Sequence, residues 1–228
     1  MLIDRSRRSP NFDTRDGRVV DMIILHYTGM ADAESAIDLL CRKGSGVSSH
    51  YVVREDGYVH ELVGEQDRAW HAGVASWFGD TAINARSIGI EIVNGGHDFG
   101  LPHYPDDQID GVIQLIHDIR SRHEIPLDLV IGHSDVAPGR KNDPGEHFPW
   151  GRLEAAGALA RPPLPQILLH GGDGWQWGQD GADVLEARKA LRKLGYGIAT
   201  EGPIDQTFAD VMRALRARYG LGGAIDIA

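Results

Sequence analysis

Three short runs rich in valine and isoleucine constrain the fold of this chain more than any other feature of its sequence. Residues 19–25 are too few for a helix of usual length, and their composition predicts a buried strand that ends at His26. Residues 87–94 and 127–131 have the same character and predict two further strands. Ligands commonly bind where a rigid strand gives way to a loop, so the residues at these strand ends are candidates for chemistry.

A hairpin and two helices complete the predicted order of elements. Residues 48–54 and 58–62 flank Asp56-Gly57, a dipeptide typical of a tight hairpin turn. Residues 31–42 predict a helix, and residues 106–124 place a row of isoleucine and valine side chains on one helical face. The order strand, helix, hairpin, strand, helix, strand predicts an α/β fold with a mixed central β-sheet flanked by helices.

The last third of the sequence predicts a second, small all-α domain. Residues 1–160 form the predicted catalytic domain, which a helix from residue 150 closes. Residues 161–172 begin with a proline-rich stretch and predict a stiff linker. Residues 173–228 form the predicted second domain, with helices at 182–194 and 205–219 that each carry an apolar stripe.

Composition excludes several classes of protein. The 228-residue chain has a formal charge of −10 with scattered acidic residues, which argues against a nucleic-acid partner. Cys41 is the one cysteine, so no internal disulfide can form. No apolar run is long enough to span a bilayer, and none follows the basic N-terminus as in a signal peptide. We therefore predict no membrane partner and a cytoplasmic location, unless another route exports the chain.

His26, His133 and Asp143 form a candidate metal site. Both histidines follow predicted strands, and Asp143 lies in a loop rich in glycine and proline that can fold back toward them. Two imidazoles and a carboxylate leave the fourth position of a tetrahedral zinc ion open for water, as in catalytic sites. Taken alone, His133 and Asp143 also fit a surface histidine and a turn aspartate.

Glu91 is a carboxylate inside an apolar strand, where its side chain must face away from those of Ile90 and Ile92. It either reaches water or is retained for a partner such as metal-bound water, because an uncompensated buried charge is costly. Residues 65–86 predict a loop whose tryptophans either cap the core or line a groove for a sugar or peptide. His50, at the hairpin entrance, either faces solvent or joins such a site.

Several short segments together resemble one family. The sequence is similar to the zinc N-acetylmuramoyl-L-alanine amidases of the type 2 amidase family, whose fold is shared with peptidoglycan recognition proteins. The resemblance covers roughly residues 10–155. It rests on His26-Tyr27-Thr28, Ser49-His50-Tyr51, Trp70-His71-Ala72-Gly73, Ser87-Ile88-Gly89-Ile90-Glu91, Gly132-His133 and Lys141-Asn142-Asp143.

The resemblance implies a role for each matching residue. It implies Zn²⁺ as the cofactor, with His26, His133 and Asp143 as its ligands and Glu91 and Lys141 as the catalytic residues. Some relatives have cysteine at the position of Asp143 and tyrosine at the position of Ser49. Because this chain has serine in place of that tyrosine, Glu91 is left as the available base. The further residues that we place around the substrate groove are Tyr27, His50, Trp70 and His71. His147 is not expected to be a ligand.

The implied reaction is hydrolysis of the amide bond between N-acetylmuramic acid, or its anhydro form, and L-alanine. Zinc would polarise the carbonyl, Glu91 would act as general base, and Lys141 would stabilise the oxyanion. The substrate is either intact peptidoglycan, in cell wall degradation, or a muropeptide, in peptidoglycan recycling. The alternative function is a protein that binds peptidoglycan without cutting it.

Residues 191–196 and 202–208 resemble the small three-helix peptidoglycan-binding domain, although the usual ending of its last helix is not clear here. The alternative is a helical appendage that only packs on the catalytic domain.

Overall fold

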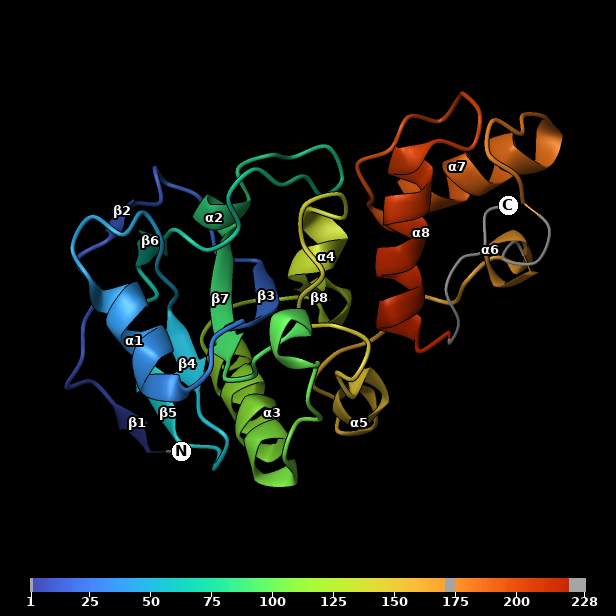
Figure 1. The fold of residues 1–228 in the computed structure, drawn as a ribbon. Helices are drawn as coiled ribbons and strands as arrows, with labels where there is room; N and C mark the ends of the chain where they lie inside the picture. Colours follow the sequence, from blue (N-terminus) through green and yellow to red (C-terminus); the bar gives the residue numbers. More distant parts are fainter. Residues whose placement is uncertain (1, 171–174, 222–228) are drawn as a thin grey trace.

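A computed structural model describes residues 2–170 and 175–221 of the chain. Its centre is a six-stranded mixed sheet with the strand order β1-β5-β4-β7-β3-β8 (Figure 1). In that order the strands are Ile3–Asp4, Val59–Glu61, Tyr51–Val53, Ser87–Ile92, Met22–Tyr27 and Val130–Gly132. A separate antiparallel pair consists of β2 (Phe12–Thr14) and β6 (Asp67–Ala69).

Helices cover both faces of the sheet (Figure 1). They are α1 (Ala33–Cys41), α2 (Ile83–Arg86), α3 (Asp106–Arg120), α4 (His133–Val136), α5 (Trp150–Ala155), α6 (Gln166–His170), α7 (Ala182–Leu194) and α8 (Gln206–Tyr219), with 3-10 turns η1 (His97–Phe99) and η2 (Leu127–Leu129). Among the described residues, no helix combines the length and the apolar character needed to cross a membrane.

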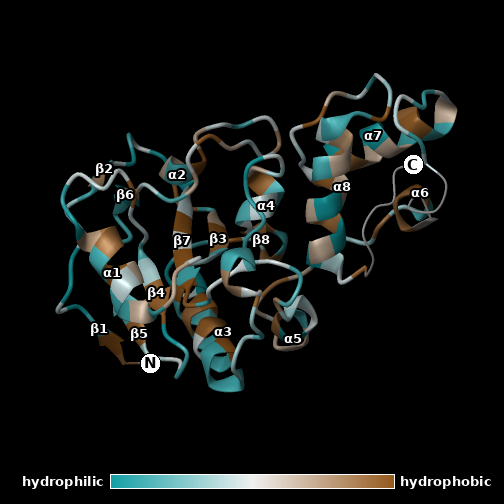
Figure 2. Cartoon of the chain, viewed as in Figure 1, coloured by the Kyte–Doolittle hydropathy of each residue, from teal (hydrophilic) through white to brown (hydrophobic). Residues whose placement is uncertain are grey.

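Strand β3, which lies between β7 and β8, sends alternate side chains into two hydrophobic cores and is buried on both faces. Ile23 and Leu25 pack in one core with the apolar stripe of α3, whereas Met22 and Ile24 pack in the other with α7 and α8. In Figure 2, much of β3 and β7 is accordingly coloured brown, as hydrophobic. The His26 side chain points to the same face of β3 as those of Met22 and Ile24, which is the face opposite α3.

This face of the sheet is covered at its two ends by different helices. At the β4 end, α1 packs Ile37 and Leu40 against Val52. At the β8 end, α7 and α8 pack against Met22, Ile24 and Ile131. The carboxyl ends of β3 and β7 lie between these two groups of helices, which leaves room there for a pocket.

The structure confirms the predicted α/β fold class and the predicted hairpin. Strands β4 and β5 pair antiparallel, and β3 pairs in parallel with both β7 and β8. The prediction of a loop throughout residues 65–86 is wrong, because β6 and α2 lie within it. A three-residue strand and a single helical turn are too short to produce a recognisable period.

The two helices predicted near the C-terminus are confirmed as α7 and α8. Asp205 caps α8 by accepting a hydrogen bond from the Phe208 backbone N–H at 2.8 Å. The predicted linker, residues 161–172, contains α6, and its last two residues lie outside the described residues. The C-terminal helices share a core with the sheet, whereas the division into two domains stays a prediction.

Candidate metal centre

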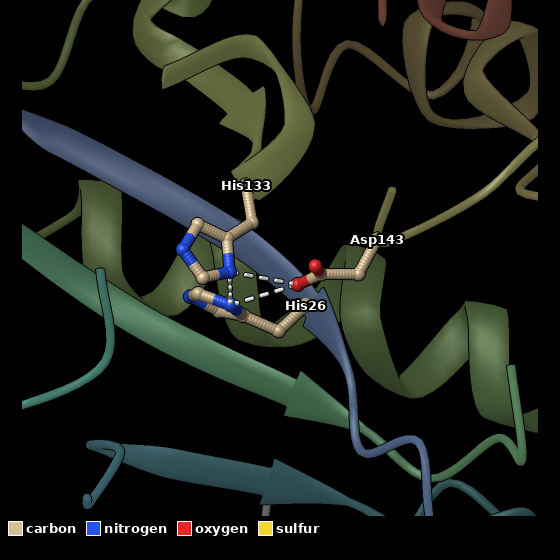
Figure 3. A group of neighbouring side chains, drawn as sticks. All are labelled: His26, His133 and Asp143. Atoms are coloured by element: carbon tan, nitrogen blue, oxygen red, sulfur yellow. Dashed lines mark hydrogen bonds and ion pairs between the residues drawn. The ribbon is translucent and has the colours of Figure 1, made fainter. Parts of the chain in front are cut away.

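His26, His133 and Asp143 converge at the carboxyl ends of β3 and β8 (Figure 3). His26 lies near the end of β3, His133 begins α4 directly after β8, and Asp143 lies in the following loop. The two Nδ1 atoms are 2.9 Å apart, and each is 3.0 Å from the Asp143 Oδ2 atom. All three side chains are buried. The predicted ligands, which are far apart in sequence, therefore share one centre.

The spacing of these atoms fits a single zinc ion. Tetrahedral ligands that each bind at ~2.0–2.2 Å lie about 3.3–3.6 Å from one another, a few tenths of an ångström more than the separations in this triangle. Two neutral imidazoles and one carboxylate are also a usual donor set for a catalytic zinc. His26, His133 and Asp143 would hold the ion, and the open side of the triangle would remain available to water or substrate.

Electrostatics favour a neutral His26 imidazole and an ionised Asp143 carboxylate, the protonation states that a metal site requires. Burial, with help from the neighbouring His133, lowers the pKa of His26 to about 4, so this imidazole is neutral at pH 7. Burial alone would raise the pKa of Asp143, but His133 and His26 outweigh it and hold this pKa below its ordinary value. Asp143 is therefore ionised at neutral pH.

The triangle opens into a pocket of about 470 Å³ that also contains the predicted catalytic residues. Glu91 and Lys141 both line this pocket. Burial and the nearby Asp143 carboxylate raise the pKa of Glu91 well above its ordinary value, and Lys141 opposes them. The Glu91 Oε2 atom is buried and accepts no hydrogen bond from the described residues. A buried carboxylate without a partner is a candidate proton carrier.

Comparison with known proteins places the chain among the bacterial amidases. A family profile described as N-acetylmuramoyl-L-alanine amidase matches residues 16–146. AmiD of Escherichia coli, an N-acetylmuramoyl-L-alanine amidase, is 36% identical over 193 residues, which are 78% of this chain and 67% of that protein. The chain belongs to the N-acetylmuramoyl-L-alanine amidase family. The predicted enzyme class is thereby confirmed.

Solved structures are similar to this amidase over most of its length. AmpDh3 from Pseudomonas aeruginosa is 30% identical, with a TM-score of 0.74, and the match covers 100% of this chain and 93% of that one. E. coli AmiD in complex with an anhydro-N-acetylmuramic acid tripeptide substrate is 29% identical, with a TM-score of 0.70, over 93% and 84% of the two chains. The likeness extends through the C-terminal helices.

Three of the four residues predicted to bind substrate lie at the pocket, and their role there stays a prediction. Tyr27, Trp70 and His71 line the same pocket as the predicted metal ligands. His71 is nevertheless mostly buried, and its Nδ1 atom lies 3.0 Å from the second ring nitrogen of His26. It therefore contacts a predicted metal ligand directly.

His50 does not lie at the pocket, so its assignment to the substrate groove needs correction. Its side chain is fully buried and does not line the pocket. Its Nδ1 atom accepts from the Gly89 backbone N–H at 3.0 Å, and its Nε2 atom lies 2.8 Å from the Arg15 guanidinium. Both ring nitrogens are thus occupied by the protein, and the contacts indicate a structural role. His147, which we did not expect to be a ligand, lies on the surface and contacts the Leu101 carbonyl.

Sequence reasoning missed a group of polar residues at the pocket. His97 lines the pocket from η1, and its two ring nitrogens lie 3.0 Å from the Tyr27 hydroxyl and 3.0 Å from a Glu146 carboxylate oxygen. His97 occupies an irregular segment without any period. The glycine pair before it, Gly95-Gly96, was the one local signal of an unusual backbone, and Gly96 has a φ of +64°.

Proposed function

We propose that this amidase is a zinc hydrolase that cleaves the amide bond between muramic acid, in its N-acetyl or 1,6-anhydro form, and L-alanine. The observation that carries the proposal is the triangle of His26, His133 and Asp143 atoms in the pocket that holds Glu91 and Lys141. Relatives described as 1,6-anhydro-N-acetylmuramyl-L-alanine amidases, such as E. coli AmpD at 37% identity over 163 residues, support a muropeptide substrate.

His26, His133 and Asp143 would hold a zinc ion, which would supply a Lewis acid to polarise the amide carbonyl and to lower the pKa of water toward ~7. Glu91 then accepts a proton from the attacking water and returns it to the nitrogen of L-alanine as the amide bond breaks. A raised pKa suits this role, because the same group must hold the proton between the two transfers. The Lys141 ammonium stabilises negative charge that develops on the carbonyl oxygen.

Tyr27 and Trp70 supply the walls of the pocket. Their rings offer flat apolar surfaces with polar edges, which suit contacts with a sugar ring or a peptide. Leu39 and Leu40 of α1 extend the apolar side of the same pocket. These side chains hold the substrate beside the ligands but take no part in proton transfer.

The test uses the purified full-length chain and two substrates, an anhydro-muropeptide and isolated peptidoglycan sacculi. Mass spectrometry of the products should find peptides that begin with a free L-alanine amine. Chelation should abolish their release, and added Zn²⁺ should restore it. Release that survives complete removal of metal would contradict the zinc mechanism, and the relative rates on the two substrates identify the preferred one.

The proposed role of residues 173–228 as a peptidoglycan-binding domain needs a separate measurement. A Glu91→Ala variant should retain binding without cutting, so its sedimentation with sacculi reports affinity alone. Binding that is unchanged by substitutions on the exposed surfaces of α7 and α8 would assign the affinity to the catalytic pocket.

A further inference from the structure

We propose that two adjacent residues, His71 and Ala72, hold both imidazole ligands in the tautomer that binds metal. This inference rests on the proposed zinc site and assigns to His71 a positioning role instead of the substrate contact predicted from the sequence. In this arrangement His71 contacts Ser87 and lies against Gly89, both on β7.

The first half of the arrangement is a chain of hydrogen bonds that ends at His26. The Ser87 hydroxyl donates its one proton to the Ile83 carbonyl at 2.7 Å, so toward His71 it acts as an acceptor. The His71 Nε2 atom, 3.2 Å away, therefore carries the proton and donates it to Ser87. The His71 Nδ1 atom is left with a lone pair.

That lone pair fixes the tautomer of His26. The His26 Nε2 atom lies 3.0 Å from His71 Nδ1 and must donate to it. A neutral imidazole has one N–H, so the His26 Nδ1 atom is unprotonated. This is the atom that faces His133 and Asp143 in the metal triangle.

The second half is the contact of His133 Nε2 with the Ala72 carbonyl, which is shorter than the 3.4 Å separation of this nitrogen from the Arg140 guanidinium. The His133 Nε2 atom lies 3.0 Å from the Ala72 carbonyl oxygen, which can only accept. His133 therefore carries its proton on Nε2 and presents the Nδ1 lone pair to the metal. Neighbouring residues of one short segment thus set the tautomers of two ligands that lie 107 positions apart in sequence.

The segment itself is fixed in place. The Asn84 Oδ1 atom accepts from the backbone N–H groups of His71 and Ala72 at 3.1 and 2.7 Å. A Cβ atom at Gly89 would lie 2.5 Å from the His71 ring, so glycine at this position leaves the space that the ring occupies. Hydrogen bonds to the second nitrogen of a histidine ligand fix its orientation and raise its basicity.

The experiment measures zinc affinity of the full chain by competition with a chelator of known affinity. His71→Leu removes the acceptor for His26 and should weaken zinc binding by ~10–100-fold. His71→Asn offers an amide oxygen near the Nδ1 position and should restore most of the loss. Ser87→Ala frees the His71 tautomer and should also weaken binding, by less than His71→Leu.

Ser49→Ala is the matched control, because Ser49 is also a fully buried serine whose hydroxyl donates to a backbone carbonyl, that of Gly89 at 2.8 Å. Its zinc affinity should match that of the wild type. The visible spectrum of the cobalt-substituted chain should change in His71→Leu and not in Ser49→Ala.

Three outcomes are decisive. Wild-type affinity in both His71→Leu and Ser87→Ala overturns the inference, and so does an equal loss in Ser87→Ala and Ser49→Ala. If circular dichroism shows that His71→Leu does not fold, the comparison of the two serine variants decides. Absence of zinc binding by the wild type would instead refute the proposed function.

Discussion

Glu91 is the register partner of His26 on the neighbouring parallel strand. Paired residues on adjacent strands point to the same face of a sheet, so this register places the proposed base beside a metal ligand. A slip of one residue between β3 and β7 would send one of the two side chains to the opposite face, where α3 packs. The catalytic arrangement therefore depends on strand pairing as much as on the identity of the residues.

Replacement of Glu91 by glutamine should remove the proton carrier and leave the metal ligands intact. We expect kcat to fall by about 10²–10⁴-fold, the usual contribution of general acid–base catalysis. Zinc content, measured by elemental analysis, should equal that of the wild type. Glu55→Gln, on the exposed hairpin turn, is the control and should retain full activity. Normal turnover in Glu91→Gln would remove this carboxylate from the mechanism.

The same substitution should stabilise the metal-free protein at neutral pH. Burial raises the pKa of Glu91 in the folded state, so below pH 4.5 both states hold the proton and this group has no effect on the free energy of unfolding. As the pH rises above 4.5, Glu91 loses its proton in the unfolded state but keeps it in the folded state. The free energy of unfolding of the wild type therefore falls until the pH passes the raised pKa of folded Glu91. Glutamine avoids this loss.

Thermal unfolding of the metal-free protein tests whether Glu91→Gln raises or lowers its stability. The Glu91→Gln variant should have a higher Tm than the wild type at pH 7.5, and the difference should shrink toward pH 4.5. Glu55→Gln should show no such trend. A variant that is less stable than the wild type at pH 7.5 would show that a partner already compensates the Glu91 charge.

Lys141→Met should impair the chemical step more than substrate binding. Removal of a group that stabilises developing negative charge commonly lowers kcat by ~10²–10³-fold. Methionine preserves much of the side-chain volume, so KM should change little. Lys193→Met, on the exposed part of α7, provides a control for loss of one positive charge. An unchanged kcat with a raised KM would mean that Lys141 binds substrate and does not act in the chemical step.

Tyr196→Phe should destabilise the fold without touching the pocket. The Tyr196 hydroxyl donates to the Asp135 carboxylate at 2.5 Å, and Asp135 is fully buried on α4. Loss of a hydrogen bond to a buried acceptor costs about 1–3 kcal/mol. Urea unfolding measures the change, with the exposed Tyr58→Phe as control. Equal stability of the two variants would show that the Asp135 contact contributes little.

The sequence predicted the central sheet and the metal triangle because both leave strong local signals. Buried parallel strands require continuous apolar runs, and polar residues such as His26 and His133 stand out where those runs end. Glu91 was recognisable for a similar reason, since a carboxylate between two isoleucines violates the pattern of its strand. The helices α7 and α8 were recognisable from their apolar stripes.

The remaining errors concern contacts between distant segments. His50 looked like a pocket residue because nothing near it in sequence reveals that Arg15 covers its ring. His71 lines the pocket as predicted, but its contacts with His26 and Ser87, which are 45 and 16 positions away, left no signal in the sequence. Residues 65–86 appeared irregular because their short elements are held by long-range pairing, as between β6 and β2. Local periodicity carries no information about such contacts.

The burial of Asp135 beneath Tyr196 has a consequence for how a polymer could meet the enzyme. Helices α7 and α8 share one hydrophobic core with β3 and α4, and the Tyr196 hydroxyl, just after α7, donates to Asp135 of α4. This shared core fixes the position of the two helices relative to the sheet. A glycan strand held by those helices would approach the scissile bond from one fixed direction. The distance between the point of attachment and the point of cleavage would then be a constant of the fold, unlike that of an enzyme on a flexible tether.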